Sequence, residues 1–271
     1  MGKIVKPIRY FGAKGNFYKE LLKYFPKAGT YEYYIEPFGG SYAMGFVNPY
    51  TAPIEIYNDL ERNVYSLYKV LSDKDLFTKF KEKCDLIYYD EDLRKEFKNK
   101  LKSDDLNLVD RAFYFFFYVN RTSHNGIGGF SCNTVIRRNM SKSISDMLST
   151  IDMLPELHQR LSRVIVLNKN ALDIIEKYGN KESVFIQADP PYVQDTRSAA
   201  RYDVDMTNEQ HNQFIELCLK CKCKMLINGY DHPIYDKLTD NGWEKIQFEV
   251  NTTSGTHKPK TKIETIWRNY I

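Results

Sequence analysis

IEPFGGS, residues 35–41, is the stretch of sequence that most narrows the fold. It follows a short apolar strand predicted over residues 33–36 and precedes a helix predicted to run to Phe46, and a second strand is predicted over residues 54–57. Glycines directly after a strand let the backbone approach a nucleoside-like cofactor closely. The spacing is not G-x-G-x-x-G, which disfavours a nicotinamide or flavin cofactor. The sequence therefore predicts a βαβ unit with a ligand-binding turn.

Helix-strand alternation resumes in the second half of the chain. It predicts an α/β fold with a mostly parallel, doubly wound sheet, helices on both faces, and ligands at the carboxyl ends of the strands. Residues 1–60 and 163–271 are expected to form this domain, and residues 61–162 a smaller, mainly helical insertion. The further predicted strands cover residues 163–167, 184–188, 224–227, 243–250 and 261–271, and the predicted helices residues 171–178, 207–221 and 232–238.

Two parts of the insertion differ in character. Residues 109–119 (VDRAFYFFFYV) are apolar on every side except at the start, which predicts a buried helix, with a strand as the competing interpretation. Residues 120–146 are rich in Gly, Ser, Asn and Arg and show no periodicity, so a loop is expected there. A loop of that length inside a compact chain is usually functional.

Composition sets broad limits on the class of protein. The chain has 271 residues, 42% of them hydrophobic, and a net charge of +4, which tolerates a polyanionic partner without requiring one. No apolar run approaches the roughly 18 residues needed to cross a bilayer. The amino-terminal residues lack the features of a secretory signal, so we expect a cytoplasmic protein without a membrane partner.

The five cysteines are too few and too irregularly spaced for a disulfide framework. Cys218, Cys221 and Cys223 lie close together, but structural zinc usually takes two separated pairs of ligands, and no second pair follows. We expect reduced thiols and no metal site.

Asp189-Pro190-Pro191-Tyr192 is the strongest signal for chemistry, because it directly follows a predicted buried strand. Asp189 offers a carboxylate acceptor, and the prolines fix φ, so that the Pro190 carbonyl becomes a rigid second acceptor. Tyr192 offers a face on which a planar base can stack. Two converging acceptors suit an amino group with two hydrogens, and holding both draws the nitrogen lone pair out of conjugation for attack on a methyl group. Asp59, at the end of a neighbouring strand, suits a ribose hydroxyl.

These motifs together resemble the Dam-like (alpha-group) DNA adenine-N6 methyltransferases. Residues 10–15, 36–40 and 58–59 resemble the family's cofactor segments. Asn120-Arg121 with Asn125-Gly126 resembles the start of its target-recognition region, and residues 189–192 its catalytic motif. The match runs in the family's order over almost the entire chain.

The resemblance implies a Rossmann-like, S-adenosylmethionine-dependent methyltransferase that methylates N6 of an adenine flipped out of double-stranded DNA. The insertion would be its target-recognition lobe, centred on residues 120–146. The implied catalytic residues are Asp189, Pro190, Pro191 and Tyr192, and the implied cofactor-binding residues are Tyr10, Lys14, Glu36, Pro37, Phe38, Gly39, Gly40, Asp59, Asn170 and Asp189.

Two departures from the family pattern stand out. Asn170 replaces the Asp that usually meets the cofactor's adenine amino group, although an amide oxygen still accepts that bond. Ile127 follows Asn125-Gly126 where members that read GATC carry an arginine shortly afterwards, so GATC recognition is not implied.

Phosphate neutralisation by basic residues is expected to supply most of the DNA affinity. The candidate DNA contacts are Arg121, Asn125, Arg137, Arg138, Arg197, Lys258 and Lys260, with Lys262 nearby. A cognate restriction endonuclease is a compatible partner. A role in a phage is also compatible with the sequence. We expect a monomer or weak dimer.

Two other kinds of function stay open at this point. One is an amino methyltransferase of the same fold that acts on cytosine N4, on RNA or on a protein glutamine. The other is an inactive homologue that binds DNA without catalysis.

Overall fold

The computed structural model describes residues 7–8, 17–124, 127–193, 205–252 and 260–271. The chain divides into two compact units, each of which is considered by itself. Unit 1 comprises residues 1–14, 40–47 and 61–168, and unit 2 comprises residues 15–39, 48–60 and 169–271. The insertion predicted over residues 61–162 falls within the longest part of unit 1.

A seven-stranded mixed sheet is the main β structure of the described residues. Its strand order is β10-β11-β9-β8-β1-β2-β7. Strand β1 pairs in parallel with β2 and β8, and β8 pairs in parallel with β9, whereas β11 is antiparallel to both β9 and β10. The strands are β1 (Tyr33–Glu36), β2 (Ile54–Asn58), β7 (Val164–Leu167), β8 (Val184–Ala188), β9 (Lys224–Tyr230), β10 (Glu244–Thr252) and β11 (Lys260–Arg268).

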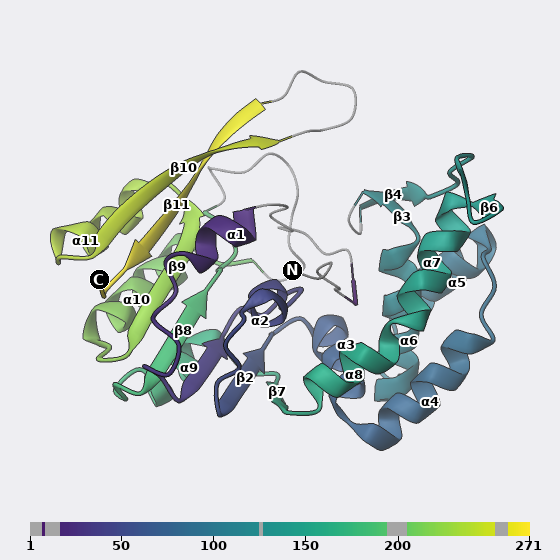
Figure 1. Ribbon diagram of the computed structural model, residues 1–271, viewed down its shortest axis with the longest axis horizontal. Helices are drawn as coiled ribbons and strands as arrows, with labels where there is room; N and C mark the ends of the chain where they lie inside the picture. The colour runs from purple at the N-terminus through teal and green to yellow at the C-terminus, as the bar shows by residue number, and fades with distance from the viewer. Residues whose placement is uncertain (1–6, 9–16, 125–126, 194–204, 253–259) are drawn as a thin grey trace. The chain divides into compact units, whose positions relative to one another are not determined.

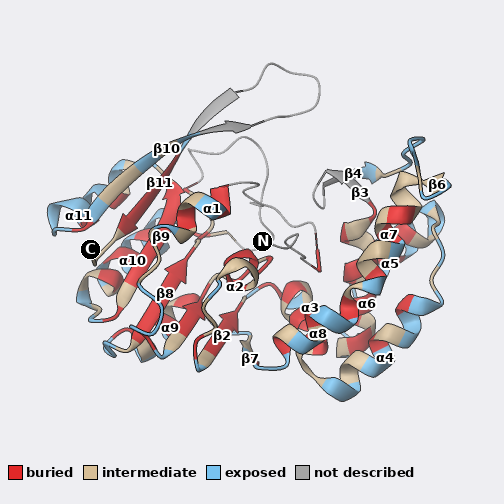
Figure 2. Ribbon diagram, in the orientation of Figure 1, coloured by how far each residue is buried: buried red, intermediate tan, exposed pale blue. Residues whose placement is uncertain are grey.

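The sheet order confirms the predicted fold class. Helices flank a mostly parallel sheet in which chain order reverses at β1, as in doubly wound α/β folds. Strand β8 is buried along its whole length, and Figure 2 shows the red of buried residues running along it. Strands buried on both faces read as continuous apolar runs, which explains why the sequence located them well.

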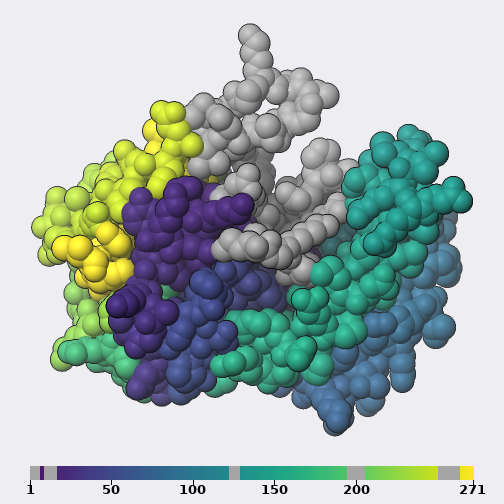
Figure 3. Space-filling model, viewed as in Figure 1, coloured from purple at the N-terminus to yellow at the C-terminus, as the bar shows by residue number. Residues whose placement is uncertain are grey.

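The helices of unit 2 are set by local capping signals. Thr207 and Gln210 form a reciprocal capping box at the start of α10, and Asn170 accepts from the Leu172 amide at the start of α9. Helix α1 lies against the C-terminal hairpin (Figure 3), and the ring centroids of Phe17 and Phe248 are 5.3 Å apart. The helices are α1 (Phe17–Leu22), α9 (Ala171–Tyr178), α10 (Asn208–Lys220), the 3-10 turn η2 (Pro233–Tyr235) and α11 (Asp236–Asp240).

Unit 1 is mainly helical and packs around α6 (Leu108–Asn120), which contacts α3, α4 and α5 (Figure 1). Helix, not strand, is therefore the correct interpretation of the aromatic run, and Phe97 and Phe80 pack against its rings. Asn107 caps the helix by accepting from the Asp110 amide. The other helices are α2 (Ala43–Val47), α3 (Arg62–Ser72), α4 (Lys74–Asp85), α5 (Glu91–Lys100), α7 (Lys142–Asp152) and α8 (Leu154–Leu161).

Two short hairpins replace the loop expected over residues 120–146. Strands β3 (Thr122–His124) and β4 (Ile127–Phe130) pair antiparallel, as do β5 (Ile136–Arg137) and β6 (Met140–Ser141). Strands of two to four residues are too short to show an alternating pattern in the sequence. The expectation of an irregular loop was therefore wrong for the two hairpins, and also for residues 142–146, which begin α7.

Three cysteines lie at the junction of α10 and β9. Cys218 and Cys223 are buried, Cys221 is half-buried, and all three are free thiols. The Cys221 thiol donates to the Leu217 carbonyl oxygen at 3.2 Å. Within the described parts of the chain, no helix is long and apolar enough to cross a membrane.

Candidate active site

The carboxyl ends of four parallel strands bring the sequence motifs of unit 2 to one edge of the sheet. Glu36 ends β1, Asn58 ends β2, Asp189 directly follows β8, and Tyr230 ends β9. In the ladder of β8 and β9, Ala188 lies opposite Ile227, so the next residues, Asp189 and Asn228, meet at the edge. This is the edge at which open α/β sheets bind ligands.

Asn58 fastens the turn that follows β1. Its side-chain amide donates to the Pro37 carbonyl oxygen at 2.8 Å and to the Lys169 carbonyl oxygen at 2.9 Å, and its side-chain oxygen accepts from the Lys169 amide at 2.9 Å. The Gly39 amide donates to the Asn58 backbone oxygen at 2.8 Å. One buried asparagine thus holds the glycine turn and the segment that precedes α9.

Gly39 has no room for a side chain. An ideal Cβ at this position would lie 2.2 Å from Cε2 of Tyr57, whose ring is fully buried. We expect Gly39→Ala to lower the free energy of unfolding by about 1–3 kcal/mol, because the turn or the ring must move. Urea unfolding measures this change. Gly129→Ala is the control, since a Cβ there meets nothing within 4 Å and stability should stay within about 0.5 kcal/mol of the parent. An equal effect of the two substitutions would contradict the account.

The residues expected to bind a cofactor occupy different environments. Glu36 is buried, and its carboxylate accepts from the Tyr34 hydroxyl at 2.6 Å, whereas Asp59 is half-buried. Asn170 is exposed, and its side-chain oxygen caps α9 at 3.0 Å from the Leu172 nitrogen. An amide oxygen has two lone pairs, so this bond does not consume its acceptor capacity.

Side-chain contacts orient both ends of the catalytic motif predicted at residues 189–192. Asp189 accepts from the Asn228 side-chain amide at 2.5 Å. The Tyr192 hydroxyl donates to the Glu264 carboxylate at 3.0 Å, and its ring lies edge-on to Tyr230 with centroids 4.5 Å apart. Pro190 is buried and Pro191 half-buried. The carboxylate and the aromatic ring therefore have fixed positions at one strand end.

Five of the predicted site residues lie outside the described residues: Tyr10, Lys14, Asn125, Arg197 and Lys258. The backbone of Lys260 begins β11 opposite Thr252.

The hairpin of β5 and β6 carries two of the predicted DNA contacts. Arg138 and Asn139 form its two-residue turn with φ of 52° and 59°, the left-handed pair that a type I′ turn requires. Arg138 is exposed and donates to the Ser149 hydroxyl at 3.0 Å. Arg137 forms an ion pair with Asp146. The hairpin thus presents one arginine to solvent and holds the other beside an acid.

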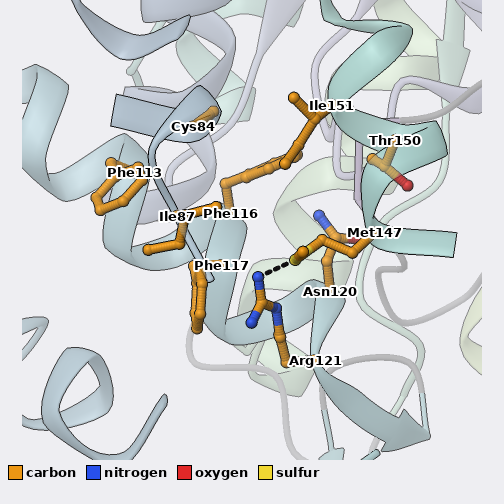
Figure 4. Close-up of a pocket in the computed structure, with 10 residues that line it drawn as sticks. All are labelled: Cys84, Ile87, Phe113, Phe116, Phe117, Asn120, Arg121, Met147, Thr150 and Ile151. Atoms are coloured by element: carbon orange, nitrogen blue, oxygen red, sulfur yellow. Dashed lines mark hydrogen bonds between the residues drawn. The ribbon is translucent and has the colours of Figure 1, made fainter. Parts of the chain in front are cut away.

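Arg121 does not fit the predicted DNA contact, because its side chain is only 1% exposed. The guanidinium carbon lies 3.4 Å from the centroid of the Phe117 ring and 4.5 Å from that of Tyr89. It donates to the Tyr88 carbonyl oxygen at 3.0 Å and to the Met147 sulfur (Figure 4). Burial lowers the pKa of Arg121 to about 9, whereas the neighbouring Tyr89 and Asp90 act to raise it. The side chain is a packing element of unit 1.

Substitution of Arg121 separates these two roles. We expect Arg121→Ala to lower the free energy of unfolding by about 2–4 kcal/mol through loss of packing, and Arg121→Met to cost less than half as much. Neither change should alter the dependence of DNA affinity on salt, measured by fluorescence anisotropy. A phosphate-binding arginine would instead leave stability unchanged and reduce the salt slope by about one.

Sequence reasoning missed the polar residues that support the motif. Asn228 and Gln187 are 1% and 2% exposed, and each interrupts an otherwise apolar buried strand. Glu264 is also buried, on β11 opposite Tyr230. A buried polar residue in an apolar strand is informative, and this was the signal available for Asn228 and Gln187.

Comparison with known proteins shows that most of the chain matches one protein family. Residues 10–252 match the family described as D12 class N6 adenine-specific DNA methyltransferase. No curated protein sequence matches the chain. Among solved structures, the chain is similar to a protein from Pyrococcus horikoshii described provisionally as an RNA methyltransferase. The identity is 8% and the TM-score 0.40, over 99% of this chain and 88% of that one.

Proposed function

The chain belongs to the D12 class N6 adenine-specific DNA methyltransferase family, and from this we propose that it transfers a methyl group from S-adenosylmethionine to N6 of an adenine flipped out of duplex DNA. The observation that carries the proposal is the contact of Asp189 with Asn228 at 2.5 Å, on the ligand-binding edge of the sheet. A carboxylate held there suits the capture of an amino group.

The turn after β1 supports binding of the cofactor. Gly39 offers bare backbone where a Cβ would strike Tyr57, and Glu36 presents a carboxylate held by Tyr34. Glu36, Asp59 and Asn170 would accept hydrogen bonds from the hydroxyl and amino groups of the nucleoside, with Tyr10, Lys14, Pro37, Phe38 and Gly40 completing the contacts. When bound, S-adenosylmethionine supplies an electrophilic methyl group.

Residues 189–192 would position the target amine. Asp189 and the Pro190 carbonyl would accept its two hydrogens, which moves electron density onto the nitrogen as it attacks. Asp189 is then the nearest acceptor for the proton that the nitrogen must lose. Tyr192 would stack on the extruded base. Pro191, like Pro190, has no amide hydrogen and cannot compete for these acceptors.

DNA affinity must come largely from phosphate contacts. Extruding a base costs a few kcal/mol, and stacking on one ring returns only about 1–3 kcal/mol. Arg137, Arg138, Lys258, Lys260 and Lys262 are the proposed phosphate contacts, with Asn125 and Arg197 also at the DNA. Five such contacts predict a slope of about −4.5 for log K against log salt concentration, measured by anisotropy. A flat dependence would exclude this mode of binding.

The order of the motifs favours the Dam-like arrangement within the family, with the cofactor segments before the target-recognition lobe and residues 189–192 after it. The departure at Ile127 points away from GATC.

Analysis of the methylated nucleoside tests the proposal. Duplex DNA is incubated with the protein and methyl-labelled S-adenosylmethionine, digested to nucleosides and separated by chromatography. Label in N6-methyl-2′-deoxyadenosine supports the proposal. Label in N4-methylcytosine, or only in RNA or protein acceptors, overturns it in favour of another amino methyltransferase. Absence of cofactor binding in calorimetry would support an inactive DNA-binding homologue.

A further inference from the structure

Two buried side-chain amides form a series of hydrogen bonds that ends on Asp189. The Gln187 amide nitrogen donates to the Asn228 side-chain oxygen at 2.6 Å, and the Asn228 amide nitrogen donates to Asp189 Oδ1 at 2.5 Å. The three residues come from the adjacent parallel strands β8 and β9 and from the first position after β8. Both amides are almost fully enclosed. This series of hydrogen bonds therefore lies within the sheet rather than in a surface loop.

The carboxylate fixes the donor-to-acceptor direction of both hydrogen bonds in this series. An ionised carboxylate only accepts hydrogen bonds, so the nitrogen of Asn228 must face it. The oxygen of Asn228 then faces Gln187, which must in turn donate its own N–H. Each amide has one orientation that satisfies its neighbour. The arrangement is thus a one-way set of donors aimed at Asp189.

Two amides in this place are costly for a sheet. Their neighbours along the strands, including Ile186, Ala188, Leu226 and Ile227, are buried and apolar. An amide buried without a partner costs about 1–3 kcal/mol, and a pair of apolar residues of the same shape would satisfy the core as well. The contact with the Asp189 carboxylate, at the end of the series, therefore explains why amides occupy these two positions.

We propose that Asn228, backed by Gln187, is a positioning residue for Asp189, and that its donor fixes the plane in which the carboxylate receives the target amine. The proposal rests on the proposed function, because it assumes that Asp189 accepts from that amine. The terminal torsion of an aspartate is broad and poorly determined by itself. A donor at 2.5 Å restricts it, and Gln187 prevents the donor from rotating.

Other ionisable groups also surround this corner of the site. Burial raises the pKa of Tyr235, with smaller contributions from Cys218 and Asp189. The Tyr235 hydroxyl therefore stays protonated and lies 3.0 Å from Nδ1 of buried His211. Tyr192 engages Glu264 and Tyr230 instead. Among these contacts, the donor that reaches Asp189 from β9 is Asn228.

The test separates positioning from stability by comparing single and double variants. Asn228→Leu removes the donor but leaves the buried Gln187 amide without an acceptor, so the protein is expected to lose stability. In the double variant Asn228→Leu with Gln187→Leu, both amides become apolar groups of similar size, which can be nearly neutral for stability. Both proteins should transfer methyl groups in a single turnover about 10- to 100-fold more slowly than the parent, the loss expected for one hydrogen bond to a charged group.

Asn269, which directly follows β11, supplies a control because its side chain also binds the backbone of β9. Its side chain accepts from the Met225 amide at 2.8 Å and donates to the Cys223 carbonyl oxygen at 2.9 Å, at the start of β9 rather than at its end. Asn269→Leu should lower stability and leave the single-turnover rate of the folded protein unchanged. Affinities for DNA and for S-adenosylmethionine should stay within about threefold of the parent in all variants, because both amides are buried within the sheet.

The outcomes are distinguishable. A double variant that is folded, binds both ligands and transfers methyl groups at the parent rate overturns the positioning role, while the proposed function stands if Asp189→Ala is inactive. A parent protein that methylates no adenine, or an Asp189→Ala variant as fast as the parent, refutes the proposed function and the positioning role with it. A stable but slow double variant, together with a fast Asn269→Leu, supports the positioning role.

Discussion

Asp189→Ala should reduce the single-turnover rate of methyl transfer to adenine by about a thousandfold, because the group that would hold the amine is gone. The fold should persist, since the Asp189 side chain is only half-buried at the edge of the sheet. The cost in stability should be about 1–2 kcal/mol, from the Asn228 donor left without its acceptor. Single-turnover kinetics with saturating protein measure the rate, and circular dichroism with urea unfolding measures the fold.

Asp189→Asn is the matched control for this experiment. The amide oxygen can still accept from Asn228, so stability should stay close to that of the parent. The rate should nevertheless be well below the parent rate, because the carboxylate charge is lost. An alanine variant that is folded and as fast as the parent would remove Asp189 from the reaction.

Tyr192→Ala should slow methyl transfer by about 10- to 100-fold, since the loss of base stacking is worth about 1–3 kcal/mol. Affinity for S-adenosylmethionine should change by less than about threefold, because the ring packs against Tyr230 of β9 and its hydroxyl donates to Glu264 of β11. The measurement is single-turnover kinetics combined with the fluorescence of 2-aminopurine at the target position. The parent should raise that fluorescence and the alanine variant should raise it less.

Tyr192→Phe keeps the ring beside Tyr230 and removes only the hydroxyl that donates to Glu264. Its rate should fall by no more than about fivefold, the worth of one ordinary hydrogen bond. A phenylalanine variant as slow as the alanine variant would assign the work of this residue to the hydroxyl and not to stacking.

The central elements of the fold could be predicted because their signals are local. The predicted ranges of β1, β8 and α9 agree with the structure at both ends, since short apolar runs or an amphipathic segment are bounded there by proline, glycine or a capping residue. The parallel arrangement followed from the alternation of helices and strands. These inferences needed no information about which strands are neighbours.

The hairpins of unit 1 and the role of Arg121 could not be predicted in this way. The type I′ turn at Arg138 and Asn139 lacks the Asn-Gly or Asp-Gly pair that usually marks such a turn. Arg121 looks like a surface cation in the sequence, and only the arrangement of Phe117 and Tyr89 around it shows that it is buried. Tertiary packing decides such cases.

The supporting residues of the site were missed for a related reason. Asn228 lies 39 residues after Asp189, and their contact depends on the register of β8 against β9. A sequence pattern shows that Asn228 is polar within an apolar strand, but it does not show what the side chain faces. The glycine turn was located from sequence, whereas the part that Asn58 plays in fastening it needed coordinates.

The most direct test of the account is a crystal structure of the protein with duplex DNA and a non-reactive analogue of S-adenosylmethionine. We predict an extruded adenine whose N6 lies within about 3 Å of both an Asp189 carboxylate oxygen and the Pro190 carbonyl oxygen, with the analogue against the turn at residues 36–40. An adenine still stacked in the duplex, or an analogue bound away from that turn and from Asp189, would contradict the account.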